Sequence, residues 1–89
     1  MGHTPESELA ERLKDANQKV EVGSRYRHSK TAREYVVRDI ILYEQTEQPI
    51  VVYQAEYGDK LTWARDVDVF IEPVKIDGQT VPRFVTVNK

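Results

Sequence analysis

The sequence predicts a mostly β domain, a small and strongly bent barrel of five to six short strands that follows one N-terminal α-helix. Residues 20–89 contain seventeen Val or Ile but only two Leu, whereas residues 1–19 contain two Leu and no Val or Ile; β-branched residues favour strands. The 89 residues suffice for one hydrophobic core, and a barrel leaves fewer unpaired strand edges than two small sheets. We therefore expect a tail and helix (1–19) and a barrel domain (20–89).

The composition excludes several classes of protein. Thirteen basic and fifteen acidic residues give a net charge of −2, so the chain lacks the overall positive charge on which non-specific nucleic-acid binders rely, and any nucleic-acid contact would have to be local. It has no cysteine, which removes disulfides, thiolate nucleophiles and Cys-ligated metal sites. No apolar run approaches the roughly 20 residues of a membrane span. We expect a soluble, cytoplasmic protein without membrane contact, metal or cofactor.

The N-terminal segment has the pattern of a helix from about Pro5 to Asn17. Thr4 is placed to cap this helix, Pro5 suits its first position, and Asn17 is expected to end it. One narrow apolar stripe recurs at helical spacing and consists of Leu9, Leu13, Ala16 and Val20. Because so narrow a stripe does not stabilise a helix alone, we expect the helix to dock weakly on the sheet or to pair with a second copy as a homodimer.

Strand signals occupy the remainder of the chain. The expected strands are Val20–His28, Glu34–Tyr43, Ile50–Tyr57, Leu61–Arg65, Ile71–Ile76 and Thr80–Val87. Asp77-Gly78 is typical of a hairpin turn, Pro82 indicates an edge strand, and Asp66–Phe70 indicates a helical turn. Glu34–Tyr43 alternates little, which favours burial on both faces. Four aromatic residues are assigned to the core: Tyr53, Trp63, Phe70 and Phe84.

Five short motifs hold most of the aromatic and charged residues. They are Tyr-Arg-His-x-Lys (26–30), Val-Val-Tyr-x-Ala-x-Tyr-Gly-Asp (51–59), Trp-x-Arg (63–65), Phe-x-Glu-x-Val (70–74) and Asp-Gly-x-x-x-Pro-Arg-Phe (77–84). In this order and spacing, the segment from Gly23 to Phe84 resembles the bacterial domain-of-unknown-function family 1653. The resemblance implies a compact, mostly β barrel of the Src-homology-3 (SH3) type and no established activity. The chain departs from the family pattern at Thr31, where glycine is usual, and at Asp66, where proline is usual.

These motifs leave two interpretations open. The tyrosines and Trp63 can form the barrel core, with their polar atoms hydrogen-bonded. They can instead form an aromatic floor beside Arg27, Arg65 or Arg83, suited to stacking a base or holding a phosphate or carboxylate. His28 titrates in the range of a general acid or base, although a histidine beside an aromatic residue is more often structural. Residues 25–38 also form a local basic segment.

We interpret the chain as a non-enzymatic binding module whose aromatic and arginine rim binds an anionic or planar ligand, either a nucleotide, a nucleic acid or a peptide. The alternative is a small hydrolase-like enzyme with His28 as general base and Asp59 and Arg65 in support. Asp59 is expected to contact an arginine, because a guanidinium can serve a carboxylate while it stacks on a ring. The candidate ligand-binding residues are Tyr26, Arg27, His28, Tyr57, Asp59, Trp63 and Arg65.

Overall fold

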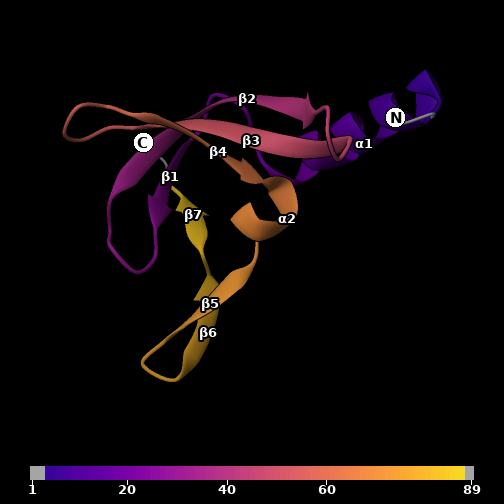
Figure 1. Cartoon of the computed structure of the whole chain (residues 1–89). Coiled ribbons are helices and arrows are strands. Elements are labelled where there is room, and N and C mark those ends of the chain that lie inside the picture. Colours follow the sequence, from indigo (N-terminus) through magenta and orange to yellow (C-terminus); the bar gives the residue numbers. More distant parts are fainter. Residues whose placement is uncertain (1–3, 88–89) are drawn as a thin grey trace.

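The computed structural model describes residues 4–87, so the first three residues of the predicted tail and the last two of the chain lie outside it. The described residues form seven short strands and two helices (Figure 1). In chain order these are α1 (Glu6–Lys19), β1 (Arg25–His28), β2 (Glu34–Tyr43), β3 (Gln48–Ala55), β4 (Thr62–Asp66), α2 (Val67–Phe70), β5 (Pro73–Ile76), β6 (Gln79–Pro82) and β7 (Phe84–Thr86). The mostly β class with one N-terminal helix is confirmed.

The strands form an open sheet and a separate hairpin rather than a barrel. Five antiparallel strands follow the order β4-β3-β2-β1-β7, and β5 pairs only with β6. Among residues 4–87, β4 and β7 are therefore the two edges of the sheet, and no pairing closes it. The expectation of a closed barrel is wrong, and the SH3 type is not confirmed. The reason lies after β4, where α2 and the hairpin turn the chain away before β7 joins β1 (Figure 1).

A β-bulge explains the weak alternation in β2. The register with β3 shifts between Val37 and Asp39, so Val37 and Ile40 both lie on one face although three positions separate them. Only these two residues of β2 are buried. Burial of β2 on both faces was thus a wrong prediction, because the extra residue of the bulge disturbs the period of two.

The core lies on one face of the sheet, which we call the inner face and which carries Val37, Val51 and Tyr53. The two phenylalanines stack over this face, with ring centroids 4.1 Å apart and planes 6° apart for Phe70 of α2 and Phe84 of β7. Tyr53 meets Phe70 edge-on at 5.3 Å and Phe84 at 5.7 Å. The core assignments of Tyr53, Phe70 and Phe84 are confirmed, since each is less than 9% exposed.

Trp63 does not belong to the core. It pairs with Tyr53 across β3 and β4, so its side chain lies on the inner face, yet it remains 50% exposed. The cause is the open sheet: among the described residues β4 is an edge strand, and no strand lies beyond it to cover the indole. The assignment of Trp63 to the core was wrong because it assumed a closed barrel, whereas the sheet is open at β4.

The helix α1 reaches the core with its C-terminal half. Ala16 and Val20 are buried in the same cluster as the sheet residues, and Leu13 packs against that cluster. The helix continues two residues beyond Asn17, whose Nδ2 donates to the Leu13 carbonyl at 2.8 Å, and Thr4 makes no capping bond but donates to Glu47. None of the helices within residues 4–87 is long and apolar enough to cross a membrane.

The hairpin β5–β6 confirms the turn that the sequence predicts. Asp77 and Gly78 both have positive φ, 52° and 80°, as a type I′ turn requires. The segment after the turn is not one strand, because Arg83 separates β6 from β7. Its backbone carbonyl accepts from the Ser29 amide at 2.8 Å, and this interruption swings the chain from the hairpin to the sheet.

We expect Phe70→Ala to lower the free energy of unfolding by about 3–5 kcal/mol, because it removes a fully buried ring that contacts three other aromatic rings. Leu61→Ala, at a position 56% exposed, is the control and should stay within about 0.5 kcal/mol. Chemical denaturation followed by circular dichroism measures both. A loss below about 1 kcal/mol for Phe70→Ala would contradict the assigned core.

We expect a protein lacking residues 1–19 to keep its sheet and unfold cooperatively, with a lower denaturation midpoint. The reason is that the helix contributes only Ala16 as a buried residue, while Val20 and the aromatic rings remain. Circular dichroism and denaturant melts test this expectation. An unfolded remainder would show that the helix is indispensable to the core.

Candidate functional site

The register of the sheet gathers three of the predicted site residues on the inner face. Trp63 pairs with Tyr53 and Arg65 with Val51, so both follow the buried side of β3. At the other edge, His28 pairs with Phe84. Cross-strand partners in an antiparallel sheet project to the same face. The open side between β4 and β7 is therefore flanked by an indole, a guanidinium and an imidazole.

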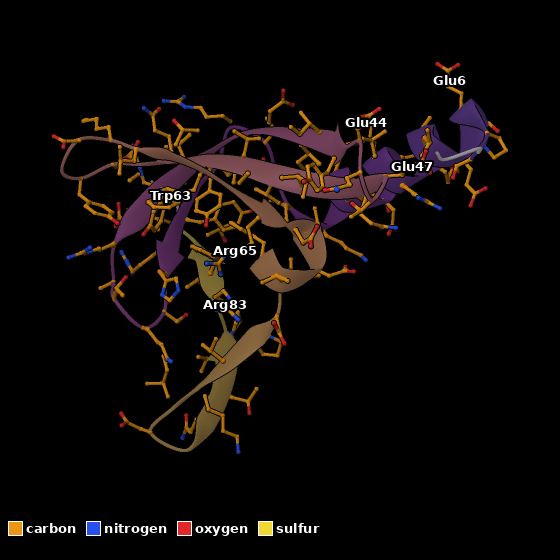
Figure 2. All side chains as sticks on the ribbon, in the orientation of Figure 1. Glu6, Glu44, Glu47, Trp63, Arg65 and Arg83 are labelled. Carbon is orange, nitrogen blue, oxygen red and sulfur yellow. The ribbon has the colours of Figure 1, made fainter. Side chains whose placement is uncertain are left out.

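A second arginine, Arg83, joins this group from the junction of β6 and β7. In Figure 2 the labelled side chains of Arg65 and Arg83 appear one below the other, both below Trp63 in this view. Burial raises the pKa of Tyr53, and the charges of Arg65 first and of Arg83 oppose this rise, as expected of guanidinium groups near the phenol. We call Arg65 and Arg83 the arginine pair.

The arginine pair has little anionic compensation. Arg65 forms no ion pair with any carboxylate of the described residues, and the terminal nitrogen of Arg83 reaches Glu72 Oε1 only at 3.4 Å. The Nε of Arg83 is buried and has no hydrogen-bond partner within residues 4–87. Buried N–H groups are normally paired. The site thus holds two positive groups and one unsatisfied donor, which suits an anion.

His28 lies beside the arginine pair as a neutral hydrogen-bond donor. Burial lowers its pKa, and the charges of Arg83, Arg65 and Lys30 lower it further. Its Nδ1 accepts from the Lys30 amide at 3.1 Å, and its ring meets Phe84 edge-on at 4.9 Å. Near neutral pH the ring proton is therefore on Nε2. In this tautomer the histidine can donate to an anion.

Tyr57 stands at the far end of the same aromatic group. Its hydroxyl lies 3.0 Å from that of Tyr35, and the Arg33 guanidinium lies 4.6 Å from its ring centroid. Desolvation and the Tyr57 hydroxyl raise the pKa of Tyr35 to about 12. Tyr57 is 37% exposed, so part of its ring faces solvent.

Three predicted residues do not join the site. Tyr26 is buried, and its hydroxyl accepts from the Glu21 amide at 2.9 Å. Arg27 pairs with Glu34 at 3.2 Å on the opposite, outer face. Asp59 lies exposed in the loop between β3 and β4 and forms no ion pair with an arginine of the described residues. The expected Asp59–arginine contact was wrong, because Asp59 lies at an exposed position of a turn in which its neighbours Gly58 and Lys60 both have positive φ.

The basic segment 25–38 divides between the two faces of the sheet. Arg25 contacts Glu56 at 2.7 Å and Glu34 at 4.0 Å on the outer face, and the Arg38 guanidinium donates twice to Gln54. The arginines of β1 are thus neutralised by carboxylates. Arg33 and Lys30, in the loop after β1, face no carboxylate within 4 Å in the described part of the chain.

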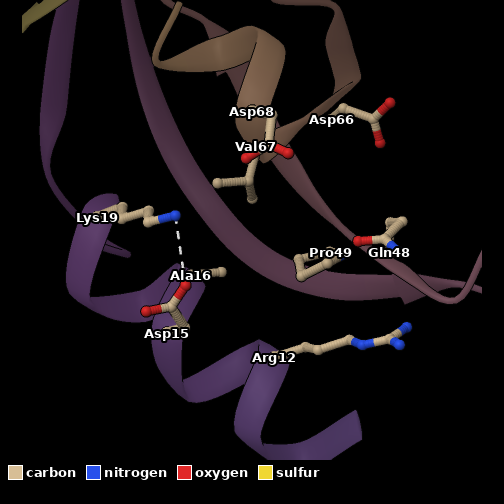
Figure 3. Close-up of a pocket in the computed structure, with 9 residues that line it drawn as sticks. All are labelled: Arg12, Asp15, Ala16, Lys19, Gln48, Pro49, Asp66, Val67 and Asp68. Carbon is tan, nitrogen blue, oxygen red and sulfur yellow. Dashed lines mark ion pairs between the residues drawn. The ribbon is translucent and has the colours of Figure 1, made fainter. Parts of the chain in front are cut away.

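Two cavities lie away from this site. One of about 280 Å³ lies between α1, β3 and α2; Arg12, Lys19, Asp66 and Asp68 are among its lining residues, and Lys19 forms an ion pair with Asp15 there (Figure 3). The other, about 650 Å³ and open, lies between the hairpin β5–β6 and the edge formed by β1 and β7. Neither is lined by His28 or Asp59. Within residues 4–87 no cluster of His, Asp or Glu could hold a metal ion.

In the sequence, Arg83 is one of three arginines near aromatic residues, and it is not among the candidate ligand-binding residues. The Pro-Arg-Phe motif at 82–84 indicates that the strand ends here, because the nitrogen of a proline cannot donate a hydrogen bond to a neighbouring strand. Arg83 is the residue at which the chain changes direction. Tyr53 was correctly placed in the core, and its proximity to both arginines depends on the register of β3 and β4.

Comparison with known proteins agrees with this architecture. A family model described as "Protein of unknown function (DUF1653)" matches residues 24–86, which include every strand. A crystal structure of a protein of that family from Bordetella bronchiseptica is similar, with a TM-score of 0.68 and 26% sequence identity. The similarity covers 79% of this chain and 90% of that chain. No curated protein matches the sequence.

We expect His28 to titrate below 6.5, and Arg83→Gln to bring its pKa closer to 6.5 by removing a nearby positive charge. Between the folded and the unfolded pKa the unfolded chain binds more protons, so stability should fall as the pH is lowered from about 6.5 through the folded pKa. NMR titration of the imidazole, assigned with His28→Gln, measures the pKa. Arg38→Gln, on the outer face, is the control; equal shifts in both variants would refute the assigned neighbourhood.

Proposed function

The chain belongs to the DUF1653 family, and we propose that it is a non-enzymatic binding module whose inner face takes an anionic ligand that carries a planar group. The anion lies between Arg65 and Arg83, and His28 donates to it from Nε2. The planar group stacks on Trp63. Tyr53 and Phe84 form the floor beneath them.

The observation that carries this proposal is the buried Nε of Arg83, which has no hydrogen-bond partner within residues 4–87. A buried guanidinium nitrogen without a partner costs folding free energy, and Arg83 holds such a nitrogen beside a second arginine that lacks a carboxylate. By contrast, the strand arginines of the outer face have acidic or amide partners. An anion bound between Arg65 and Arg83 would satisfy Nε and offset the mutual repulsion of the two charges.

Trp63 supports the planar part of the ligand. Its indole is half exposed on the inner face, two residues from Arg65 on the same strand. This spacing sets the two side chains about 6.6 Å apart along β4. A ligand with a ring next to its anionic group can therefore contact both at once, with the ring on the indole and the anion at the guanidinium.

The geometry does not favour the enzyme. A general base needs a free lone pair directed at the substrate proton, whereas Nδ1 of His28 already accepts from the Lys30 amide. Asp59 lies in a separate loop, and the cavities lie elsewhere. Acid–base chemistry of this kind commonly relies on a pocket that excludes water. His28 and Asp59 line neither of the two cavities described above.

We expect Arg65→Gln and Arg83→Gln each to weaken binding of a small anion about tenfold, corresponding to about 1.4 kcal/mol for a lost charge-assisted hydrogen bond. The probes are inorganic phosphate, a nucleoside monophosphate and a short peptide with a free C-terminal carboxylate. Amide shifts in NMR titrations give both the affinity and the place of binding.

Arg27→Gln is the matched control, because it removes an arginine of the outer face that is paired with Glu34. This variant should bind as the unchanged protein does, within twofold. The proposal fails if none of the three probes shifts residues of the inner face, or if Arg27→Gln weakens binding as much as Arg65→Gln.

A further inference from the structure

Two exposed aromatic side chains flank the site, and each has an arginine beside it. Trp63 is 50% exposed and Tyr57 37% exposed, and both belong to the hairpin formed by β3 and β4. Arg65 follows Trp63 by two residues, and the Arg33 guanidinium lies 4.6 Å from the Tyr57 ring centroid. The inner face therefore repeats one combination, an aromatic ring with an adjacent cation.

Two tyrosines of the inner face, Tyr53 and Tyr35, lie between the two exposed rings. Trp63 pairs with Tyr53 across the strands, Tyr53 lies 5.4 Å from Tyr35, and Tyr35 lies 5.7 Å from Tyr57, both between ring centroids. Tyr53 is buried and Tyr35 partly buried, and the hydroxyl of Tyr35 lies 3.0 Å from that of Tyr57. A ligand that crosses this row meets two exposed rings in succession.

Cations lie at both ends of this row of aromatic residues. Lys30 is close enough to lower the pKa of His28 together with Arg65 and Arg83, and Arg33 lies at the Tyr57 end. In residues 4–87 the one carboxylate paired with any of these four cations is Glu72, at 3.4 Å from Arg83. A chain with a net charge of −2 thus presents, beside the exposed rings, four cations of which three have no carboxylate within 4 Å in the described residues.

We propose that the ligand of this face is single-stranded nucleic acid, with successive bases stacked on Trp63 and Tyr57 and phosphates held by the arginine pair and Arg33. This inference rests on the proposed function and specifies its ligand class. Alternating rings and cations along a groove or face are the means by which single strands are bound without sequence preference. A mononucleotide would use one ring, and a peptide carboxylate would leave both rings without a stacking partner.

Trp63 provides the readout, because it is the one tryptophan of the chain. Stacking of a base on the indole should quench its fluorescence. The probes are thymidine monophosphate, oligothymidylates of two and four nucleotides, and a short peptide with a free C-terminal carboxylate. We expect the tetranucleotide to bind at least tenfold more tightly than the mononucleotide, and its affinity to fall with salt at a slope of about −0.7 for each phosphate contacted.

The variant Tyr57→Leu distinguishes binding of a nucleic-acid strand from binding of a single nucleotide. It should weaken the tetranucleotide about tenfold, within the range for one lost stacking contact, and leave the mononucleotide within twofold. Arg33→Gln should weaken the tetranucleotide and reduce its salt slope. Tyr43→Leu and Arg38→Gln are the controls, since Tyr43 is 48% exposed outside the row and Arg38 bonds Gln54 on the outer face; neither should change binding beyond twofold.

Three other outcomes would overturn the inference, and they differ in whether the proposed function survives. Equal affinities for the mononucleotide and the tetranucleotide, with no effect of Tyr57→Leu, would reject a strand but retain an anion site on the inner face. Binding of the peptide carboxylate with no response to either oligonucleotide would reject the ligand class and retain the proposed function. No binding of any probe at the inner face would reject both.

Discussion

The stacked rings of Phe70 and Phe84 are the contact on which the rest of the structure depends. They join α2, which follows β4, to β7 at the opposite edge of the sheet. The two edges are not hydrogen-bonded to each other, so aromatic packing replaces strand pairing in holding them together. Tyr26, Tyr35 and Tyr53 meet these rings edge-on, an arrangement that the ring quadrupoles favour.

The open sheet also creates the candidate site. Closure of the barrel would have buried Trp63 and placed a strand along the outer side of β4. Because the chain instead turns through α2 and the hairpin, Trp63 remains half exposed, and Arg83 enters the gap from the junction of β6 and β7. The aromatic core is thus both the support of the fold and the floor on which the arginine pair lies.

The two faces of the sheet differ in how many of their arginines are paired with carboxylates. On the outer face, Arg25 and Arg27 have carboxylates within 4 Å, and exposed pairs of this kind add little stability. On the inner side, Arg83 reaches only Glu72, Arg65 has no carboxylate within 4 Å among the described residues, and the Arg33 guanidinium lies over the Tyr57 ring. Net charge alone conceals this division, since the acidic residues that make the chain negative lie mainly elsewhere.

Local patterns in the sequence by themselves determined the helix, the extent of β2, the Asp77-Gly78 turn and the core positions of Tyr53, Phe70 and Phe84. These features depend on neighbouring residues, through the alternation of side chains, the preferences of turns and the burial of aromatic rings. The motifs at 26–30, 51–59, 63–65, 70–74 and 77–84 indicated the family. Only the tertiary structure decided that the sheet stays open, that Trp63 is exposed, that Asp59 pairs with no arginine of the described residues and that Arg65 and Arg83 both lie near Tyr53. Such pairings depend on strand register, on the bulge in β2 and on the change of direction at Arg83, because a shift of one residue moves a side chain to the other face of the sheet.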